Sequence, residues 1–486
     1  MLQYKSQEND DFSTKTFINE ENERTDELQK TKSDIDESLV KCFTNISIAY
    51  KSGNTIRLLN LLSHLNKFTL MNYFDPCSEF FLNSIPDILM NISFDKSNKF
   101  PLKCKVKALS IIESLTFEEQ YGFFHLFYNL GIINSACFNL FSEDFELILY
   151  SIRILINYFE NQNSYAEEIT RTCSLCRFIR YILRINIKDE NLERRTKYYA
   201  VLFLCKLSFI SKDKFTNCFY VSVDYLLNYS SLYQKRCNID KFIFLIVINC
   251  MQSDHKLIEQ FINNINLVNL IIDTINNNHN FTLFQLAIII LNKFYQKPDF
   301  IIQELDLSIL VSSISSYNYD DLNLIHLLHV IKKHLMFFKY ISFLYDQKFI
   351  SALSQLFDIS NFSIRAPIIE LLCLIIEYSP NDFLKCLVHE NIIQKIFEMY
   401  FSEYIDLKNI LLNSLARLLD SVSYLNNQDR SFFLSQLNEI DFSIIEEEED
   451  DENLNLMIRN LKKLYENCMK LQNDSYYSQI DFNNDY

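Results

Sequence analysis

Glycine, proline and tryptophan are scarce in this sequence: its 486 residues include 3 Gly, 6 Pro and no Trp. Three glycines are too few for the tight turns of a β-sandwich, a β-barrel or a doubly wound sheet. They also exclude a glycine-rich phosphate loop and a dinucleotide-binding fingerprint. By contrast, 49% of the residues are hydrophobic, with 42 Phe and 28 Tyr. The composition therefore predicts an all-α chain with a large apolar surface to bury.

Basic residues are also fewer than acidic ones: the sequence contains 46 Lys and Arg and 62 Asp and Glu, which gives a net charge of −16. Residues 1–36 carry ten acids and five bases, and the run 446–452 contributes seven more acids. Nucleic-acid-binding proteins normally carry a basic surface, so this balance argues against a nucleic-acid partner.

Apolar runs are short throughout the chain, and none approaches the roughly 20 residues of a membrane-spanning helix. The first residues contain no apolar stretch typical of a secretory signal. We therefore expect no membrane partner and a cytoplasmic location, with the nucleus as a further compartment. There the 13 cysteines should be reduced thiols that pack as small hydrophobic side chains.

The domain organisation follows changes in polarity and periodicity. Residues 1–36 are polar and aperiodic, so they should form a disordered acidic tail. Apolar residues at helical spacing then extend over 37–422, which we expect to be a repeat solenoid. We expect a linker with the acidic run at 423–452, a helix at 453–473 and a disordered tail at 474–486.

A core template recurs along 37–422, with apolar residues at offsets 0, +3, +4 and +7 of one helix face. The copies begin 40–50 residues apart, at Leu58, Ala108, Ser151, Ala200, Phe244, Ala287, Leu327, Leu371 and Leu415. A second helix precedes them, with offsets 0, +3, +6 and +7. Its copies begin at Ile133, Leu175, Tyr220, Ile350 and Ile393, and weaker ones at Leu82, Val268 and Leu307. Such a period in a helical chain predicts a solenoid.

A short leading helix is expected before the best copies, at 299–304, 340–345 and 382–388. Gly131 lies within Asn129-Leu130-Gly131-Ile132-Ile133, and Asn266 and Asn391 occupy the same slot in later repeats. A short helix followed by two longer ones resembles the armadillo repeat, in which a glycine stands between the first and second helices, with HEAT repeats as the close alternative. The resemblance implies a right-handed superhelical α-solenoid of about eight or nine armadillo- or HEAT-like repeats.

Catalytic and metal-binding sites are not indicated. Cys173 and Cys176 form a C-x-x-C spacing, but no second pair completes a zinc site. His326 and His329 are helical neighbours without a nearby set of further ligands, and His334 falls on a core offset. We expect no enzyme activity, no catalytic residue, no metal and no cofactor.

The resemblance also places a candidate binding groove. Peptide-binding armadillo proteins carry Trp and Asn at template offsets +2 and +6, where they hold an extended peptide. Asn157 matches this Asn, whereas the tryptophans are absent. The same offsets carry a basic row that we expect to line the concave groove together with Asn157: Arg153, Lys206, Lys293, His329, Lys333 and Arg417. Such a row favours acidic protein segments as partners, including the chain's own acidic tails.

The helix at 453–473 carries apolar residues spaced 3, 4, 3, 4 and 3, from Leu454 to Leu471. This heptad pattern fits either a dimerising coiled coil or a helix that caps the solenoid. We favour the cap and expect a monomer.

Together these patterns predict a non-catalytic protein-interaction scaffold or adaptor. A transport or chaperone-cofactor adaptor and a structural subunit of a larger assembly remain alternatives.

Overall fold

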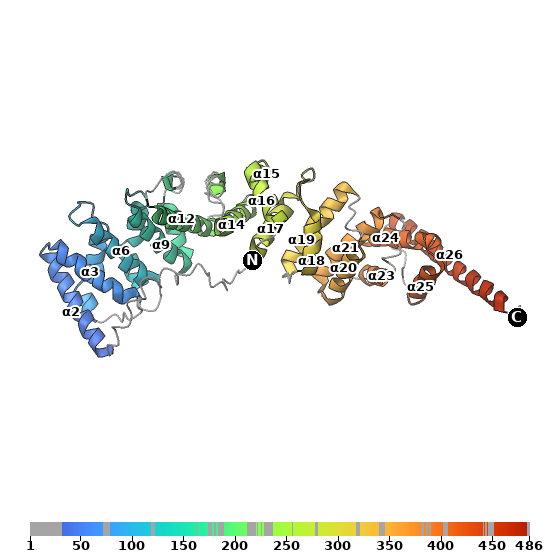
Figure 1. Ribbon diagram of the computed structural model, residues 1–486, viewed down its shortest axis with the longest axis horizontal. Coiled ribbons are helices and arrows are strands. Elements are labelled where there is room, and N and C mark those ends of the chain that lie inside the picture. The colour runs from blue at the N-terminus through green and yellow to red at the C-terminus, as the bar shows by residue number, and fades with distance from the viewer. Residues whose placement is uncertain are drawn as a thin grey trace. The chain divides into compact units, whose positions relative to one another are not determined.

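The computed structural model describes most of the chain between Lys32 and Asn483 (Figure 1). The described residues are 32–70, 78–117, 122–161, 163–173, 177–178, 181–182, 189–210, 222–224, 226–227, 237–254, 256–277, 280–316, 321–339, 346–380, 383–384, 390–401, 407–440 and 452–483, with Tyr220, Leu387, Phe442 and Ile445. These residues form helices, turns and loops, without a β-strand among them. The predicted all-α fold class is confirmed.

The chain divides into two compact units, Met1–Ser211 and Lys212–Tyr486, which we describe separately. The helices of the first unit are α2 (Lys32–Lys51), α3 (Thr55–Leu70), α4 (Ser78–Leu82), α5 (Ile85–Ser93), α6 (Leu102–Phe117), α7 (Phe123–Asn129), α8 (Ile132–Asn139), α9 (Phe145–Asn161), α10 (Asn163–Thr172) and α12 (Glu190–Ile210).

The helices of the second unit are α14 (Cys237–Ser253), α15 (Lys256–Ile262), α16 (Ile265–Asn277), α17 (Phe281–Phe294), α18 (Leu307–Ser316), α19 (Asp321–Phe338), α20 (Gln347–Ile359), α21 (Phe362–Tyr378), α23 (Ile392–Tyr400), α24 (Lys408–Ser421), a 3₁₀ turn (Val422–Tyr424), α25 (Asn427–Asn438) and α26 (Glu452–Asn483). Within the described residues, no helix is both long and apolar enough to cross a membrane.

The core template marks one helix in each repeat, which we call the third helix. In the first unit the third helices α3, α6, α9 and α12 pack consecutively, and in the second unit α14, α17, α19, α21 and α24 do the same. The template positions are buried, except Leu61 and Tyr378, which are half-buried. The predicted core register is therefore confirmed along both units.

The second-helix register agrees with the structure in several copies, since α8, α16, α18, α20 and α23 cover the expected positions. The copy at Leu82 is wrong at its first position, because Leu82 ends α4 and is 79% exposed. The copies at Leu175 and Tyr220 lie mostly outside the described residues.

The residue before the second helix adopts a left-handed backbone conformation in two of the three expected copies. Gly131 precedes α8 with φ +79°, and Asn391 precedes α23 with φ +54°, as the slot requires. The expectation for Asn266 is wrong, because α16 already begins at Ile265. There the buried Asn264 accepts a hydrogen bond from the Leu267 amide with its side-chain oxygen, 3.1 Å away.

Short leading helices occur, and α4, α7 and α15 are examples. Of the expected copies, 299–304 forms turns instead and 340–345 lies outside the described residues, whereas within 382–388 the described residues Phe383, Leu384 and Leu387 are helical. The sequence pattern therefore identified the three-helix repeat but was wrong at 299–304, because one or two helical turns carry too few core positions to show a period.

Helix α26 is longer than the expected 453–473 and packs against α24 and α25. Within 452–470 its buried side chains are Leu454, Ile458, Leu461 and Cys468. Of the expected tails and linker, residues 1–31, 441, 443–444, 446–451 and 484–486 lie outside the described residues. Residues 32–36 belong to α2, 474–483 belong to α26, and the expected linker contains part of the 3₁₀ turn and helix α25.

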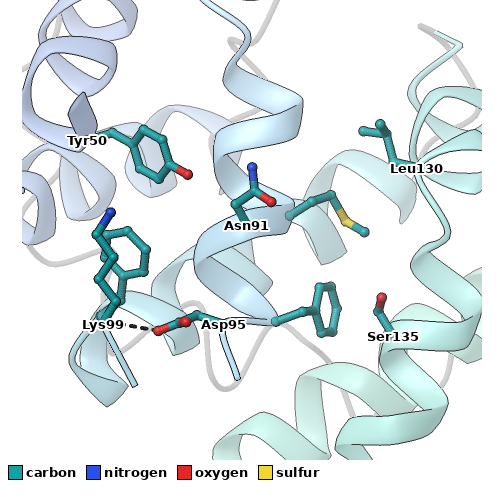
Figure 2. Close-up of a pocket in the computed structure, with 9 residues that line it drawn as sticks. Tyr50, Asn91, Asp95, Lys99, Leu130 and Ser135 are labelled. Carbon is teal, nitrogen blue, oxygen red and sulfur yellow. Dashed lines mark hydrogen bonds between the residues drawn. The ribbon is translucent and has the colours of Figure 1, made fainter. Parts of the chain in front are cut away.

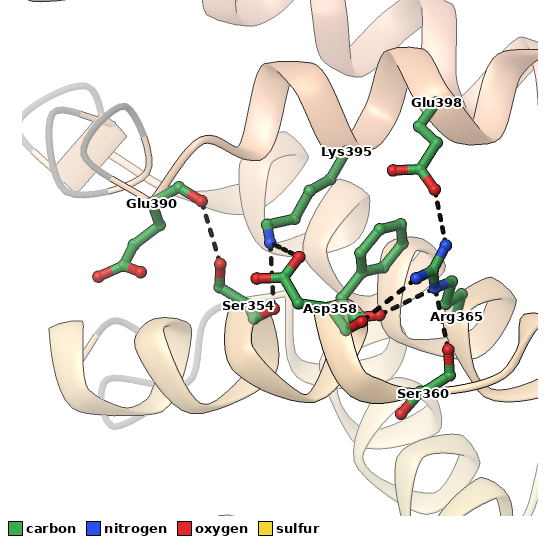
Figure 3. A network of polar contacts seen from close by, with 8 residues as sticks. Ser354, Asp358, Ser360, Arg365, Glu390, Lys395 and Glu398 are labelled. Atoms are coloured by element: carbon green, nitrogen blue, oxygen red, sulfur yellow. Dashed lines mark hydrogen bonds and ion pairs between the residues drawn. The ribbon is translucent and has the colours of Figure 1, made fainter.

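Polar contacts also join neighbouring repeats, as Figure 3 shows for α20, α21 and α23. Lys395 Nζ donates to the Ser354 carbonyl oxygen at 3.1 Å and forms an ion pair with Asp358. Arg365 contacts Glu398 at 2.6 Å and donates from Nε to the carbonyl oxygens of Phe357 and Ser360. The carbonyls at the end of α20 thus receive donors from the next helix.

Candidate functional site

The residues expected to form a groove all lie on third helices. Arg153 and Asn157 are on α9 and Lys206 is on α12, in the first unit. In the second unit, the expected residues are Lys293 on α17, His329 and Lys333 on α19 and Arg417 on α24. All except Asn157 are half-buried, so their side chains pack along their stems and reach solvent.

Arg153 is held in place by its neighbours on α6 and α12. Its Nη2 lies 2.7 Å from Glu113 Oε1, and its guanidinium carbon lies 5.2 Å from the centroid of the Tyr199 ring. Burial raises the pKa of the Glu113 carboxyl, although Arg153 and Arg195 both act to lower it. Arg153 therefore joins consecutive third helices and presents a fixed cation between them.

Asn157 does not line a groove. Its side chain is only 6% exposed, and its Nδ2 donates to the Glu113 carbonyl oxygen at 3.2 Å and to Thr116 Oγ1 at 3.3 Å. The expectation based on the family's Asn is corrected here, because the amide is turned into the α6–α9 contact and already has acceptors.

Two cations of the second unit reach carbonyl groups that follow the preceding third helix. Arg417 Nη2 donates to the Ser379 oxygen at 2.6 Å, and Ser379 directly follows α21. Lys333 Nζ donates to the Pro298 oxygen at 3.1 Å, four residues beyond the end of α17. Positive charge at helix C-termini compensates unpaired carbonyls and the helix dipole. Part of the expected basic row therefore has a structural role.

His329 lies within a polar row across α17, α19 and α21 that sequence reasoning missed. Lys332 forms an ion pair with Glu370, and Asn292 Nδ2 lies 2.7 Å from His326 Nδ1. Burial lowers the pKa of His329, Lys332 lowers it further, and Glu370 opposes both. A group of three or more His, Cys, Asp or Glu side chains suited to a metal ion does not occur among the described residues.

The first unit carries a more basic surface than the expected row. Offsets −5, −1, +2, +6 and +9 from the first template position lie on one helix face, because they are spaced by three or four residues. On α3, α6, α9 and α12 these offsets carry seven cations against the acids Glu146 and Glu160. We call the seven cations the basic face: Arg57, Lys67, Lys103, Lys107, Arg153, Arg195 and Lys206. The same offsets in the second unit carry three Lys or Arg against two acids.

The five cations of this face that sequence reasoning missed, Arg57, Lys67, Lys103, Lys107 and Arg195, could have been found from the template. They occupy further offsets of the face on which +2 and +6 lie. Arg57, Lys67 and Lys103 are exposed, and Lys107 and Arg195 are half-buried. The face can therefore attract anionic groups along four consecutive helices.

A cleft of about 440 Å³ also lies in the first unit (Figure 2). Its residues come from α2, α5, the loop 94–100 and the region of α8: Tyr50, Met90, Asn91, Phe94, Asp95, Lys99, Phe100, Leu130 and Ser135. Burial acts to raise the pKa of Asp95, but hydrogen bonds from Ser97 and Phe100 lower it to about 2. The ionised Asp95 carboxylate thus fixes the loop 94–100 by accepting these hydrogen bonds. Lys99 Nζ lies above the Tyr50 and Phe100 rings, 5.8 and 5.5 Å from their centroids.

Comparison with known proteins is informative at the level of the fold. No protein-family model and no curated protein matches the chain. Among solved structures, an engineered protein has a TM-score of 0.52 at 11% identity and covers 87% of this chain and 99% of its own. A structure concerning a phosphorylation switch that controls the interaction between cadherin and β-catenin has a TM-score of 0.50 at 13% identity. It covers 84% of this chain and 88% of its own.

A designed armadillo repeat protein in complex with the peptide (KR)4 also matches, with a TM-score of 0.37 at 11% identity over 51% of this chain and 98% of its own. The two matches with TM-scores of 0.52 and 0.50 show that the chain has an all-helical, armadillo-like repeat fold, as its sequence predicted. The number of repeats stays a prediction.

Proposed function

We propose that this chain is a non-catalytic protein-interaction scaffold whose third helices bind a segment of a partner protein. The observation that supports it is the basic face, in which four consecutive helices present cations on the same helix face in a protein of net charge −16. A repeated row of like charge on stacked helices fits a long ligand better than a small substrate, because it offers many weak contacts and no enclosed pocket.

The expected groove residues take different parts in this proposal. Lys206, Lys293 and His329 contribute half-buried polar groups to the third-helix face. Arg153, Lys333 and Arg417 keep their charge near the surface while part of their hydrogen-bonding capacity is used within the fold. Acidic segments are the partner class that this charge pattern favours.

Affinity capture with matched charge variants tests the proposal. The K103E/K107E variant reverses two cations of the basic face, and K462E/K463E reverses two cations on α26. Partners captured by the wild type and by K462E/K463E should be lost with K103E/K107E, while circular dichroism shows that all three proteins are folded. Identical partner sets for all three proteins would contradict a role for this face.

A structural subunit is a second candidate, which one apolar patch favours. Met336, Phe337 and Phe338 end α19 and are 49%, 50% and 39% exposed. Contiguous exposed apolar side chains of this kind often mark protein contacts. If partners are lost with M336S/F337S/F338S and kept with K103E/K107E, this second function replaces the first.

A further inference from the structure

The basic face stands out from the rest of the chain in charge. Helices α3, α6, α9 and α12 together contain ten Lys and Arg against five Glu, a net charge of +5. Two of these acids, Glu113 and Glu193, are buried and paired with Arg153 and Lys197. The surface of these helices is therefore positive, and an acidic chain segment is its complement.

The stacking of the helices sets the spacing that such a segment must have. Packed helices lie about 10 Å apart, and an extended chain advances about 3.3 Å per residue. A segment that crosses the third helices at a steep angle therefore meets a new helix at about every third residue. Carboxylates at positions i, i+3 and i+6 would each face a cation of a different helix along Arg57, Lys107 and Arg153, because the template offsets of these cations (−1, −1 and +2) lie at a similar height on their helices.

The chain itself contains such a segment outside the described residues. Glu20, Glu23 and Asp26 recur at every third position, and Phe17 precedes them at the same interval. Residues 20–27 contain five acids and one base. The segment therefore has both the charge and the spacing that the basic face requires.

Chain connectivity brings this segment to the face. Helices α2 and α3 pack against each other and are joined by the short turn 52–54, so they run in opposite directions. The start of α2 at Lys32 consequently lies at the level of the end of α3, where Lys67 belongs to the basic face. Asp26 precedes Lys32 by six positions, which span about 20 Å when extended. This exceeds the distance of about 15 Å along α3 from Lys67 back to Arg57.

We propose that residues 17–27 bind across the basic face, with Asp26 at α3, Glu23 at α6, Glu20 at α9 and Phe17 at α12. Phe17 would then reach the end of the row near Phe209, which is 50% exposed on α12. This proposal rests on the proposed function in that the face binds protein segments. It makes the chain's own segment the first occupant, which a partner has to displace.

The tether is essential to this arrangement. Exposed ion pairs are individually weak and are screened by salt. A segment attached only a few residues from its site has a high effective concentration there, which makes several weak pairs sufficient. Binding should therefore occur within one chain and decline as salt is raised.

Carbodiimide cross-linking of the full-length protein followed by mass spectrometry tests the proposal, because the reagent joins carboxylates to lysine amines in direct contact. We expect cross-links from residues 20–27 to Lys67, Lys103, Lys107 or Lys206, and their loss in 0.5 M NaCl. Cross-links that reach mainly lysines of the second unit, or none from residues 20–27, would overturn the proposal.

Matched variants separate position from total charge. E20Q/E23Q/D26N should abolish the cross-links between residues 20–27 and the basic face, including those of the remaining Glu21 and Glu27. The control E8Q/D10N/D11N removes the same number of charges from the same tail and should leave these cross-links unchanged. Equal loss of these cross-links in both variants would show that the total negative charge of the tail determines binding. It would reject the argument that the spacing of the three carboxylates matters.

A mixture of ¹⁴N- and ¹⁵N-labelled protein identifies the chain that supplies the segment. Cross-links within one label support the proposal, whereas mixed-label cross-links would show a second copy as the occupant and overturn it. The outcome is independent of the partner capture described above. Partners can depend on Lys103 and Lys107 without these cross-links, and the cross-links can form although no partner needs the face.

Discussion

The guanidinium group of Arg153 on α9 lies 2.7 Å from the carboxylate of Glu113 on α6, across two consecutive third helices. The Glu113 side chain is 7% exposed and that of Arg153 is 20% exposed. A buried carboxylate without its cation is costly, because the protein interior solvates charge poorly. The pair therefore contributes to the register of the helices as well as to the basic face.

Removal of Arg153 should destabilise the first unit. We expect Arg153→Met to lower the free energy of unfolding by about 3 kcal/mol, because Glu113 stays buried without its partner. A second substitution, Glu113→Leu, should recover most of this loss. Urea denaturation followed by circular dichroism measures both variants, and a double variant no more stable than Arg153→Met would contradict the pairing argument.

The core register predicts the effect of truncating leucines. Leu371 and Leu415 are 0% and 1% exposed at the first template position, so replacement of either by Ala should cost about 2–5 kcal/mol through lost burial and a cavity. Leu456→Ala is the matched control, because Leu456 is 57% exposed. Similar denaturation midpoints for the three variants would refute the register.

His334 should make the second unit sensitive to acid. Burial lowers its pKa to about 4, from an ordinary value near 6.5. Between these values the unfolded chain binds the proton and the folded chain does not. The stability is therefore complete above about pH 6.5 and declines as the pH falls toward 4, by roughly 3 kcal/mol in all.

The variant His334→Gln isolates this contribution. His334 Nε2 lies 2.6 Å from the Tyr295 hydroxyl, and a glutamine side chain can form a hydrogen bond to the same group without titrating. Thermal unfolding measured from pH 7 to pH 4.5 should show a shallower decline for the variant. The same decline in both proteins would assign the acid sensitivity to other groups.

Helix α26 should close the end of the second unit. Ile458 is 0% exposed against the packed helices, so Ile458→Asp should lower the thermal midpoint by several degrees, whereas the exposed control Leu456→Asp should not. Sedimentation velocity should report a monomer for the wild type and for both variants. A wild-type dimer that becomes a monomer in Ile458→Asp would instead indicate a coiled-coil contact.

The sequence was most informative where a pattern repeats many times. The template from Leu58 to Leu415 predicted the third helices and nearly all of their buried positions, since each copy confirms the others. Single features were less reliable. Asn157 matched a family residue but is buried, and Asn266 occupied a turn slot but lies inside α16. Such residues depend on side-chain direction, which one position in a sequence does not reveal.

The composition and the period of this sequence by themselves determined an all-helical repeat fold, because burial of one apolar face per helix requires helices to stack at that interval. Only the tertiary structure decided which cations serve the fold and which form a surface. Arg417 is directed to a carbonyl oxygen beyond α21, whereas Lys103 is exposed on the first unit. The two side chains have the same charge, and their different roles arise from the helix ends and carboxylates that packing brings near them.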